Sequence, residues 1–151
     1  MTTRGPEMTQ EGEGSTLYHI SFERLAELKR SPTALLAARR CPSCPSLGTP
    51  LHELTDPEVL VSEIAEYCGG GEGSIQSNMP LQEIVFRVLL ARRNQPTSLH
   101  DLHYQLTERW ASPVKPVNIS RAGLGRILDA DTYYGFAQVS VQTQQPAITS
   151  G

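Results

Sequence analysis

The chain has 151 residues, of which 38% are hydrophobic and 19% charged, and its formal net charge is −3. This length suits one ordinary domain or two very small ones. The apolar runs are too short to cross a membrane, and residues 1–16 lack the apolar core of a secretory signal. We therefore expect an intracellular protein, cytoplasmic or nucleoid-associated. A sequence pI near 5.8 argues against a broadly basic coat for nucleic acid.

Charge and composition divide the chain near its middle. Residues 1–79 carry 6 basic and 11 acidic side chains, whereas residues 80–151 carry 7 basic and 5 acidic ones. The boundary falls in a glycine-rich stretch that has little to bury and loses much entropy on ordering. We therefore expect two modules joined by a linker and flanked by disordered tails. In chain order these five segments are residues 1–16, 17–68, 69–78, 79–142 and 143–151.

The first module is predicted to be helical. Ser21 is a good N-cap for a short helix that ends before Pro32, and Pro32 suits the first turn of a second helix. After a loop rich in cysteine and proline, Thr55 and Glu58 fit a capping box for a third helix. Gly69 is the expected end of that helix.

All three cysteines of the chain lie in this module, at Cys41, Cys44 and Cys68, and His52 lies between them. The odd count and the expected intracellular location argue against a disulfide framework. Two thiolates three positions apart can hold one ion from a tight turn, and Cys68 and His52 can complete a tetrahedron. The spacing therefore predicts a structural zinc site that stabilises a small module.

Other interpretations of these residues stay open. The cysteines can be unligated buried thiols beside a surface His52, or they can serve a redox or iron–sulfur role. A redox pair normally follows a strand of a thioredoxin-like unit, which is not expected here. A zinc-deaminase site is set aside because no His-x-Glu element precedes the cysteine pair. His100 and His103 are also close in sequence, but they lack a nearby third ligand, and His103 is expected in a helix core.

The second module opens with the clearest helical periodicity in the chain. Its apolar residues fall at helical spacing: Leu81, Ile84, Val85, Val88 and Leu89. A second helix follows a cap at Thr97 or Ser98, and a third spans about residues 121–129. The period then changes to two over residues 137–142, which predicts a half-buried strand.

This element order, three helices and a strand, is typical of a winged helix-turn-helix domain. The module contains the stretches PLQEIVFRVLLARRNQPTSLHDLHYQLTERW and ILDADTYYGFAQV. The pattern over residues 80–141 resembles winged-helix domains of the HARE-HTH type, similar to the N-terminal domain of the RNA polymerase delta subunit. Two features depart from that family. The connector before the third helix is long and carries two prolines, and no second wing strand follows Val141.

The resemblance implies that the third helix is a recognition helix. Its expected contacts with nucleic acid are the polar residues of the helix and its approach: Lys115, Asn118, Ser120, Arg121 and Arg126. An arginine there can pair with guanine or hold a phosphate. Asp129 and Asp131 follow the same helix and would repel a phosphate backbone, whose neutralisation supplies most of the affinity of DNA-binding proteins.

The sequence therefore predicts a mainly α-helical protein. A small zinc-stapled helical module precedes a winged-helix-like module of three helices with a short C-terminal β element. The expected function is non-enzymatic binding associated with nucleic acid, with DNA and a protein as expected partners. The alternative is a protein–protein interaction or assembly adaptor that does not bind nucleic acid. An enzyme is not expected, because the chain shows no phosphate-binding loop, nucleophile elbow or His-Glu-x-x-His motif.

Overall fold

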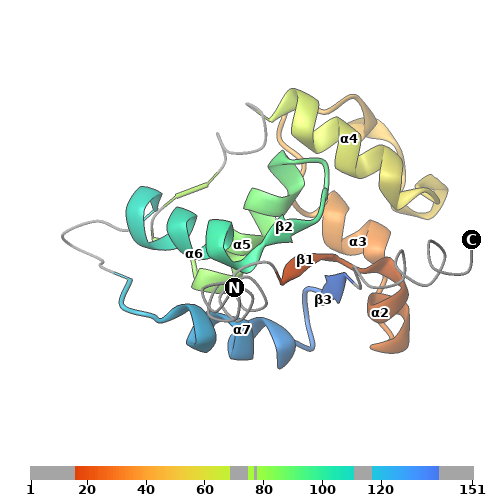
Figure 1. The fold of residues 1–151 in the computed structure, drawn as a ribbon. Coiled ribbons are helices and arrows are strands. Elements are labelled where there is room, and N and C mark those ends of the chain that lie inside the picture. The colour runs from red at the N-terminus through yellow and green to blue at the C-terminus, as the bar shows by residue number, and fades with distance from the viewer. Residues whose placement is uncertain (1–15, 69–74, 77, 111–116, 140–151) are drawn as a thin grey trace, which may run out of the picture.

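The protein is described by a computed structural model that covers residues 16–68, 75–76, 78–110 and 117–139 (Figure 1). These residues form mostly helices and one small antiparallel sheet, which confirms the predicted mainly α fold. None of the described helices is both long enough and apolar enough to span a bilayer.

The helices and strands follow one another along the chain. The α-helices are α2 (Phe22–Glu27), α3 (Pro32–Ala37), α4 (Pro57–Tyr67), α5 (Leu81–Ala91), α6 (Leu99–Tyr104) and α7 (Arg121–Asp129). The strands are β1 (Leu17–Ile20), β2 (Thr97–Ser98) and β3 (Phe136–Val139). Shorter helical turns are η1 (Pro45–Gly48), η2 (Leu51–Glu53) and the π-helical η4 (Gln105–Arg109), which continues α6.

Side-chain caps begin most of these helices. Hydroxyl oxygens accept the backbone N–H of a residue three positions on, and they belong to Ser21, Ser31, Ser98 and Ser120. The prediction for α4 was wrong by one residue. Its N-cap is Asp56, whose carboxylate accepts the N–H of Glu58, in place of the expected Thr55. A carboxylate there also suits the positive end of the helix dipole.

The sheet joins segments that are far apart in the sequence. β1 lies between β2 and β3 and is antiparallel to both, with Leu17 opposite Ser98 and Val139. Beyond the end of the short β2, the side-chain amide of Asn94 forms hydrogen bonds with the backbone of β1. It accepts the N–H of Ile20 and donates to the Ile20 carbonyl, both at 2.8 Å. The segments predicted as separate modules therefore share one sheet.

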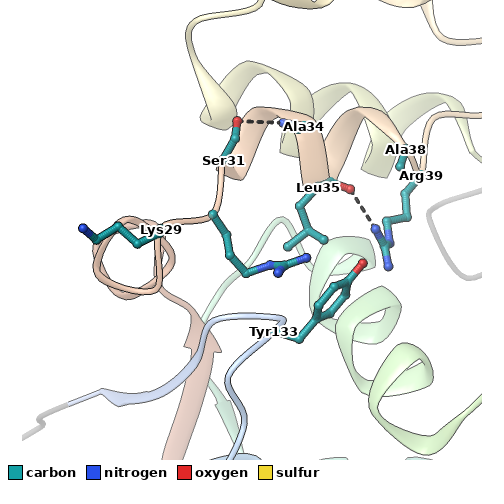
Figure 2. Close-up of a pocket in the computed structure, with 8 residues that line it drawn as sticks. Lys29, Ser31, Ala34, Leu35, Ala38, Arg39 and Tyr133 are labelled. Atoms are coloured by element: carbon teal, nitrogen blue, oxygen red, sulfur yellow. Dashed lines mark hydrogen bonds between the residues drawn. The ribbon is translucent and has the colours of Figure 1, made fainter.

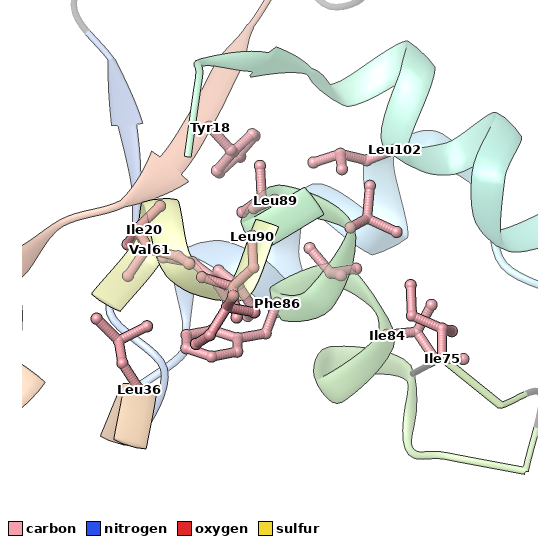
Figure 3. Close-up of a cluster of buried hydrophobic side chains, with 14 of the residues drawn as sticks. Tyr18, Ile20, Leu36, Val61, Ile75, Ile84, Phe86, Leu89, Leu90 and Leu102 are labelled. Carbon is pink, nitrogen blue, oxygen red and sulfur yellow. The ribbon is translucent and has the colours of Figure 1, made fainter. Parts of the chain in front are cut away.

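The core also draws on both predicted modules. Figure 3 shows buried side chains meeting from distant parts of the chain: Tyr18, Ile20, Leu36, Val61, Phe86 and Leu102. Helix α5 lies at the centre of this core, and it is buried beyond its predicted apolar stripe, since Phe86 and Leu90 are at most 1% exposed. A helix that is apolar on most sides needs partners on most sides, and here they come from β1, α4 and η4.

Two peripheral parts of the fold lie on different sides of this core. α4 packs on α3 and α5, whereas α7 packs on α6 and β3. Figure 1 shows α4 and the loop before it on one side of the molecule, with α7 on the opposite side. Chemistry at the end of α4 is therefore separate from any surface that α7 presents.

Candidate functional site

Three thiols form a cluster at the C-terminal end of α4. The Sγ atoms of Cys41, Cys44 and Cys68 all lie within 4.8 Å of one another, and none is in a disulfide. The Cys41–Cys44 sulfur distance is 3.9 Å and the Cys44–Cys68 distance is 3.6 Å. Tetrahedral zinc with Zn–S bonds of about 2.3 Å separates its sulfur ligands by about 3.8 Å. The cluster therefore has the dimensions of a site for one metal ion.

Local backbone geometry brings the sulfurs together. The Cys44 N–H donates to the Cys41 carbonyl at 3.0 Å, which closes a tight turn and puts these two side chains close together. Cys44 also precedes η1, and Cys68 is the C-cap of α4. The Cys41 thiol lies 3.3 Å from the Tyr67 carbonyl oxygen, at the end of α4. A turn thus supplies two sulfurs and a helix end supplies the third.

The cysteine loop, defined as residues 41–56, is fastened to both neighbouring helices by polar contacts. The Ser46 N–H and hydroxyl donate to the two carboxylate oxygens of Glu63 on α4, at 2.8 and 2.5 Å. Arg40 donates to the Ser46 carbonyl and to the Ala37 carbonyl at the end of α3. Sequence reasoning missed Arg40 and Glu63, because charged residues on a helix or beside its end give no sign of a partner in a distant loop.

Burial governs the charge of the thiols. Cys44 and Cys68 are 3% and 5% exposed. Burial raises the pKa of the Cys44 thiol and raises that of Cys68 to about 12, whereas the hydrogen bond with Cys68 lowers the pKa of Cys41. Buried thiolates need a compensating positive charge nearby. A metal cation bound by the three sulfurs would supply it.

The fourth predicted ligand, His52, lies outside the cluster. Its side chain is 80% exposed, and its Nε2 atom lies 3.8 Å from the Glu53 carboxylate. The short turn η2 directs the imidazole into solvent, a direction that the spacing of the residues in the sequence does not reveal. Within the part of the chain that the structure describes, three of the four predicted ligands come together.

The polar surface of α7 contains most of the residues predicted to contact nucleic acid. Asn118, Ser120 and Arg126 are exposed and Arg121 is half-buried, whereas Lys115 lies outside the described residues. The Ser120 hydroxyl accepts the helix-capping N–H at 2.9 Å, so its oxygen already serves α7 itself. The structure therefore leaves Asn118, Arg121 and Arg126 as the side chains available to a ligand.

His103 has a structural position next to this surface. Its Nε2 atom lies 2.6 Å from the carbonyl oxygen of Ile119, just before α7 begins. The half-buried imidazole therefore links α6 to the approach of α7. This contact agrees with the expectation of a hydrogen-bonded core histidine, and His100 is exposed on the same helix.

The two carboxylates expected to repel a phosphate backbone have internal partners. Asp129 accepts hydrogen bonds from the Tyr18 hydroxyl at 2.9 Å and from the Gln138 amide at 3.0 Å. Burial, followed by the bond to Asp129, raises the pKa of Tyr18 to about 12. Asp131 accepts backbone N–H groups of the loop leading to β3, those of residues 133–136. Both carboxylates thus secure the C-terminal end of α7 to the sheet.

Two candidate sites, the thiol cluster and the α7 surface, therefore lie on opposite sides of one core. The thiol cluster can hold a metal ion and so fix the cysteine loop to α4. The α7 surface offers hydrogen-bond donors and positive charge. No family model matches the chain, and neither a curated protein nor a solved structure shows significant similarity to it.

Proposed function

We propose that the protein is a non-enzymatic nucleic-acid-binding protein whose fold is stapled by a structural zinc ion. Sulfur separations of 3.6 and 3.9 Å support a single ion. A [2Fe–2S] cluster takes four cysteine thiolates, whereas this chain has three cysteines. In a [4Fe–4S] cluster each thiolate binds a different iron, which spreads the sulfurs further apart. Thiolates also favour zinc among the common divalent ions.

The proposed zinc ion connects the end of α3 with the end of α4. Three thiolates occupy three positions of a tetrahedron, and the fourth is left to water or to a group outside the described residues. The cysteine loop has only short helical turns, and its residues Leu47 and Leu51 are exposed. A loop with so few buried apolar side chains gains order from a metal that ties its first residues, Cys41 and Cys44, to Cys68 at the end of α4.

The arrangement of the sheet supports a winged-helix-like organisation. In a winged helix, three helices pack on a three-stranded antiparallel sheet, and the middle strand follows the recognition helix as the second strand of the wing. The middle strand here is β1, which comes from the N-terminal part of the chain. The proposed domain therefore has α5, α6 and α7 as its helices, and β1 takes the middle position that a second wing strand would occupy.

The nucleic-acid proposal rests on the arginines of the α7 surface and on the partners of the nearby carboxylates. Arg121 and Arg126 form no salt bridge with any described residue. The neighbouring carboxylates of Asp129 and Asp131 accept hydrogen bonds within the protein, from Tyr18 and from the loop backbone. Unpaired arginines on a helix that follows a helix–turn are the expected contacts with phosphates or guanine edges.

DNA binding is testable by fluorescence anisotropy with random-sequence duplexes across a range of salt concentrations. We expect Arg121→Gln and Arg126→Gln each to weaken binding and to reduce the slope of log affinity against log salt by about 1. Arg93→Gln is the matched control, because Arg93 is an exposed arginine on the turn after α5. Binding that is absent at low salt, or that responds equally to all three substitutions, would overturn the proposal.

A second candidate function is a protein-interaction adaptor, favoured by several exposed apolar side chains. They belong to the cysteine loop and to α4, and they are Leu47, Leu51, Val59 and Tyr67, between 43% and 58% exposed. In this case Val59→Glu would abolish retention of a protein partner, and Arg126→Gln would leave it unchanged. Affinity purification with both variants separates the two functions.

A further inference from the structure

A cavity of about 400 Å³ opens beside the turn between α2 and α3, within the size range of small-molecule sites. Its walls come from α3, from that turn and from the loop before β3: Lys29, Arg30, Ser31, Leu35, Arg39 and Tyr133, with two alanines of α3. Figure 2 shows Leu35, Arg39 and Tyr133 facing the same space, while Lys29 extends outward from the turn. All charged residues that line the cavity are basic, although acidic residues outnumber basic ones in the chain.

Arg30 has no counter-ion among the residues that the structure describes. Its guanidinium lies 3.9 Å from the centroid of the Tyr133 ring, and the residue is half-buried. Among the described residues it forms no salt bridge, and its Nε atom is buried without a hydrogen-bond partner. A partly buried charge is costly unless it is paired. The Tyr133 ring holds the guanidinium in place, but it cannot supply the missing negative charge.

Arg39, in contrast, is a fixed wall of the cavity. It forms two hydrogen bonds with the Glu83 carboxylate, at 2.7 and 3.1 Å, and a third with the Leu35 carbonyl at 2.9 Å. Glu83 also pairs with Arg87 at 2.7 Å, so one carboxylate faces two guanidinium groups. The Arg39 side of the cavity is therefore rigid and does not neutralise the charge of Arg30.

We propose that this cavity binds a small molecule that carries a phosphate group. A phosphate dianion matches the two cations that have no carboxylate partner among the described residues, Arg30 and the exposed Lys29 at the rim. Arginine recognises phosphate through several N–H groups at once. The cavity is larger than one phosphate, so the remainder of the ligand would pack against Leu35 and the α3 alanines, with the Tyr133 ring beside it. This site goes beyond the proposed function, because it is formed by residues outside α7.

The proposal is tested by calorimetric titration of the full chain with two probes, adenosine monophosphate and inorganic phosphate. We expect saturable binding of the nucleotide, and weaker binding of phosphate alone, because phosphate leaves most of the cavity empty. Arg30→Gln should weaken nucleotide binding at least tenfold. Ala34→Glu, which adds a negative charge to the cavity wall, should abolish it without removing the Arg30–Tyr133 contact. Thermal unfolding of each variant verifies that it is folded.

Two control variants make the outcome specific. Arg93→Gln removes an exposed charge outside the cavity and should leave nucleotide affinity unchanged, whereas a loss of affinity in Arg126→Gln would place the nucleotide on α7 and overturn the cavity proposal. If folded wild type binds neither probe, or if Arg93→Gln weakens binding as much as Arg30→Gln does, the proposal is wrong. If Arg30→Gln instead weakens duplex DNA binding while the nucleotide does not bind, the cavity is part of a nucleic-acid surface. Failure of DNA binding alone leaves the cavity proposal intact.

Discussion

The cysteine loop and helix α7 are held to the same core by different kinds of interaction. α7 buries Leu124 and Leu128 completely, and its first turn is capped by Ser120. The cysteine loop buries little apolar surface and depends on the Ser46–Glu63 hydrogen bonds and on three clustered thiols. We therefore expect the position of α7 to depend on packing, and the position of the loop to depend on polar contacts and a metal. The predictions below separate these two dependences.

The largest effect is expected from a substitution that disturbs the packing of α7 on the core. Leu128→Ala removes a side chain that is 0% exposed and should lower the free energy of unfolding by about 2–5 kcal/mol. Because α7 shares its core with β1 and α5, the whole described fold should lose stability together. Urea denaturation measures the change, and Leu47→Ala, at an exposed position of the cysteine loop, should cost less than about 0.5 kcal/mol. Equal losses in the two variants would contradict the comparison.

The next effect concerns the metal. Zinc present at about 1,000 times its dissociation constant adds about 4 kcal/mol of stability to a protein that binds it only when folded. Chelation should therefore lower the Tm of the wild type, while Cys68→Ser should lower it without chelator and make it insensitive to chelator. Metal content by elemental analysis should fall from one zinc per chain to none in that variant. Ser62→Ala, at an exposed site on α4, should retain both zinc and Tm.

The third effect concerns Glu83 on α5, which pairs with Arg39 just before the cysteine loop. Although burial opposes ionisation, hydrogen bonds from Arg39 and Arg87 lower the pKa of Glu83 from 4.5 to about 2. A carboxylate whose pKa is lower in the folded state stabilises the fold at pH values above its unfolded-state pKa. That contribution is lost as the pH falls through 4.5 toward about 2. Glu83→Gln should therefore lower the free energy of unfolding by about 2–3 kcal/mol at neutral pH.

The measurement for Glu83 is a difference. Wild-type and Glu83→Gln stabilities, obtained from urea denaturation between pH 7 and pH 2, should converge as the carboxylate becomes protonated. Subtracting the two curves cancels the titration of the other carboxylates. A stability difference that stays constant across this pH range would show that the Arg39–Glu83 pair is not the source of the effect.

The smallest effect is expected where Glu63 fastens the cysteine loop to α4. Glu63→Gln keeps the size of the side chain but weakens the charge-assisted bonds from Ser46, at a cost of about 1 kcal/mol. Zinc affinity should also fall by about tenfold, since the loop positions two of the sulfurs. Glu66→Gln on the same helix is the matched control, because Glu66 is exposed. Competition with a chromogenic zinc chelator gives both affinities.

Features that depend on neighbouring residues were predictable. Ser21 and Ser120 begin helices because a serine oxygen reaches the N–H group three residues on, and this needs no distant partner. The apolar spacing of α5 was also visible in the sequence. At α4 two adjacent residues, Thr55 and Asp56, could both cap the helix, and the sequence does not show which one the backbone places in the extended conformation.

The candidate metal cluster was partly predictable. Cys41 and Cys44 share a turn, so their proximity follows from their spacing. Cys68 joins them because it ends a helix that packs on α3. His52 was predicted to complete the site, but only the conformation of η2 decides where its ring points, and it points into solvent. Likewise, Arg30 and Tyr133 are far apart in sequence, and nothing local indicates that they meet across a cavity.

By itself the sequence determined the helical content, most of the helix starts and the thiol pair of the Cys-x2-Cys turn, because each of these depends on interactions within a few residues. Its period-two pattern also predicted the part of β3 over residues 137–139, although that strand forms only by pairing with the distant β1. The tertiary structure alone decided that residues 17–20 form the middle strand of the sheet. A four-residue strand has too few local contacts to be stable alone, and its hydrogen-bond partners, β2 and β3, lie far along the chain. The same long-range pairing joins both halves of the sequence into one core.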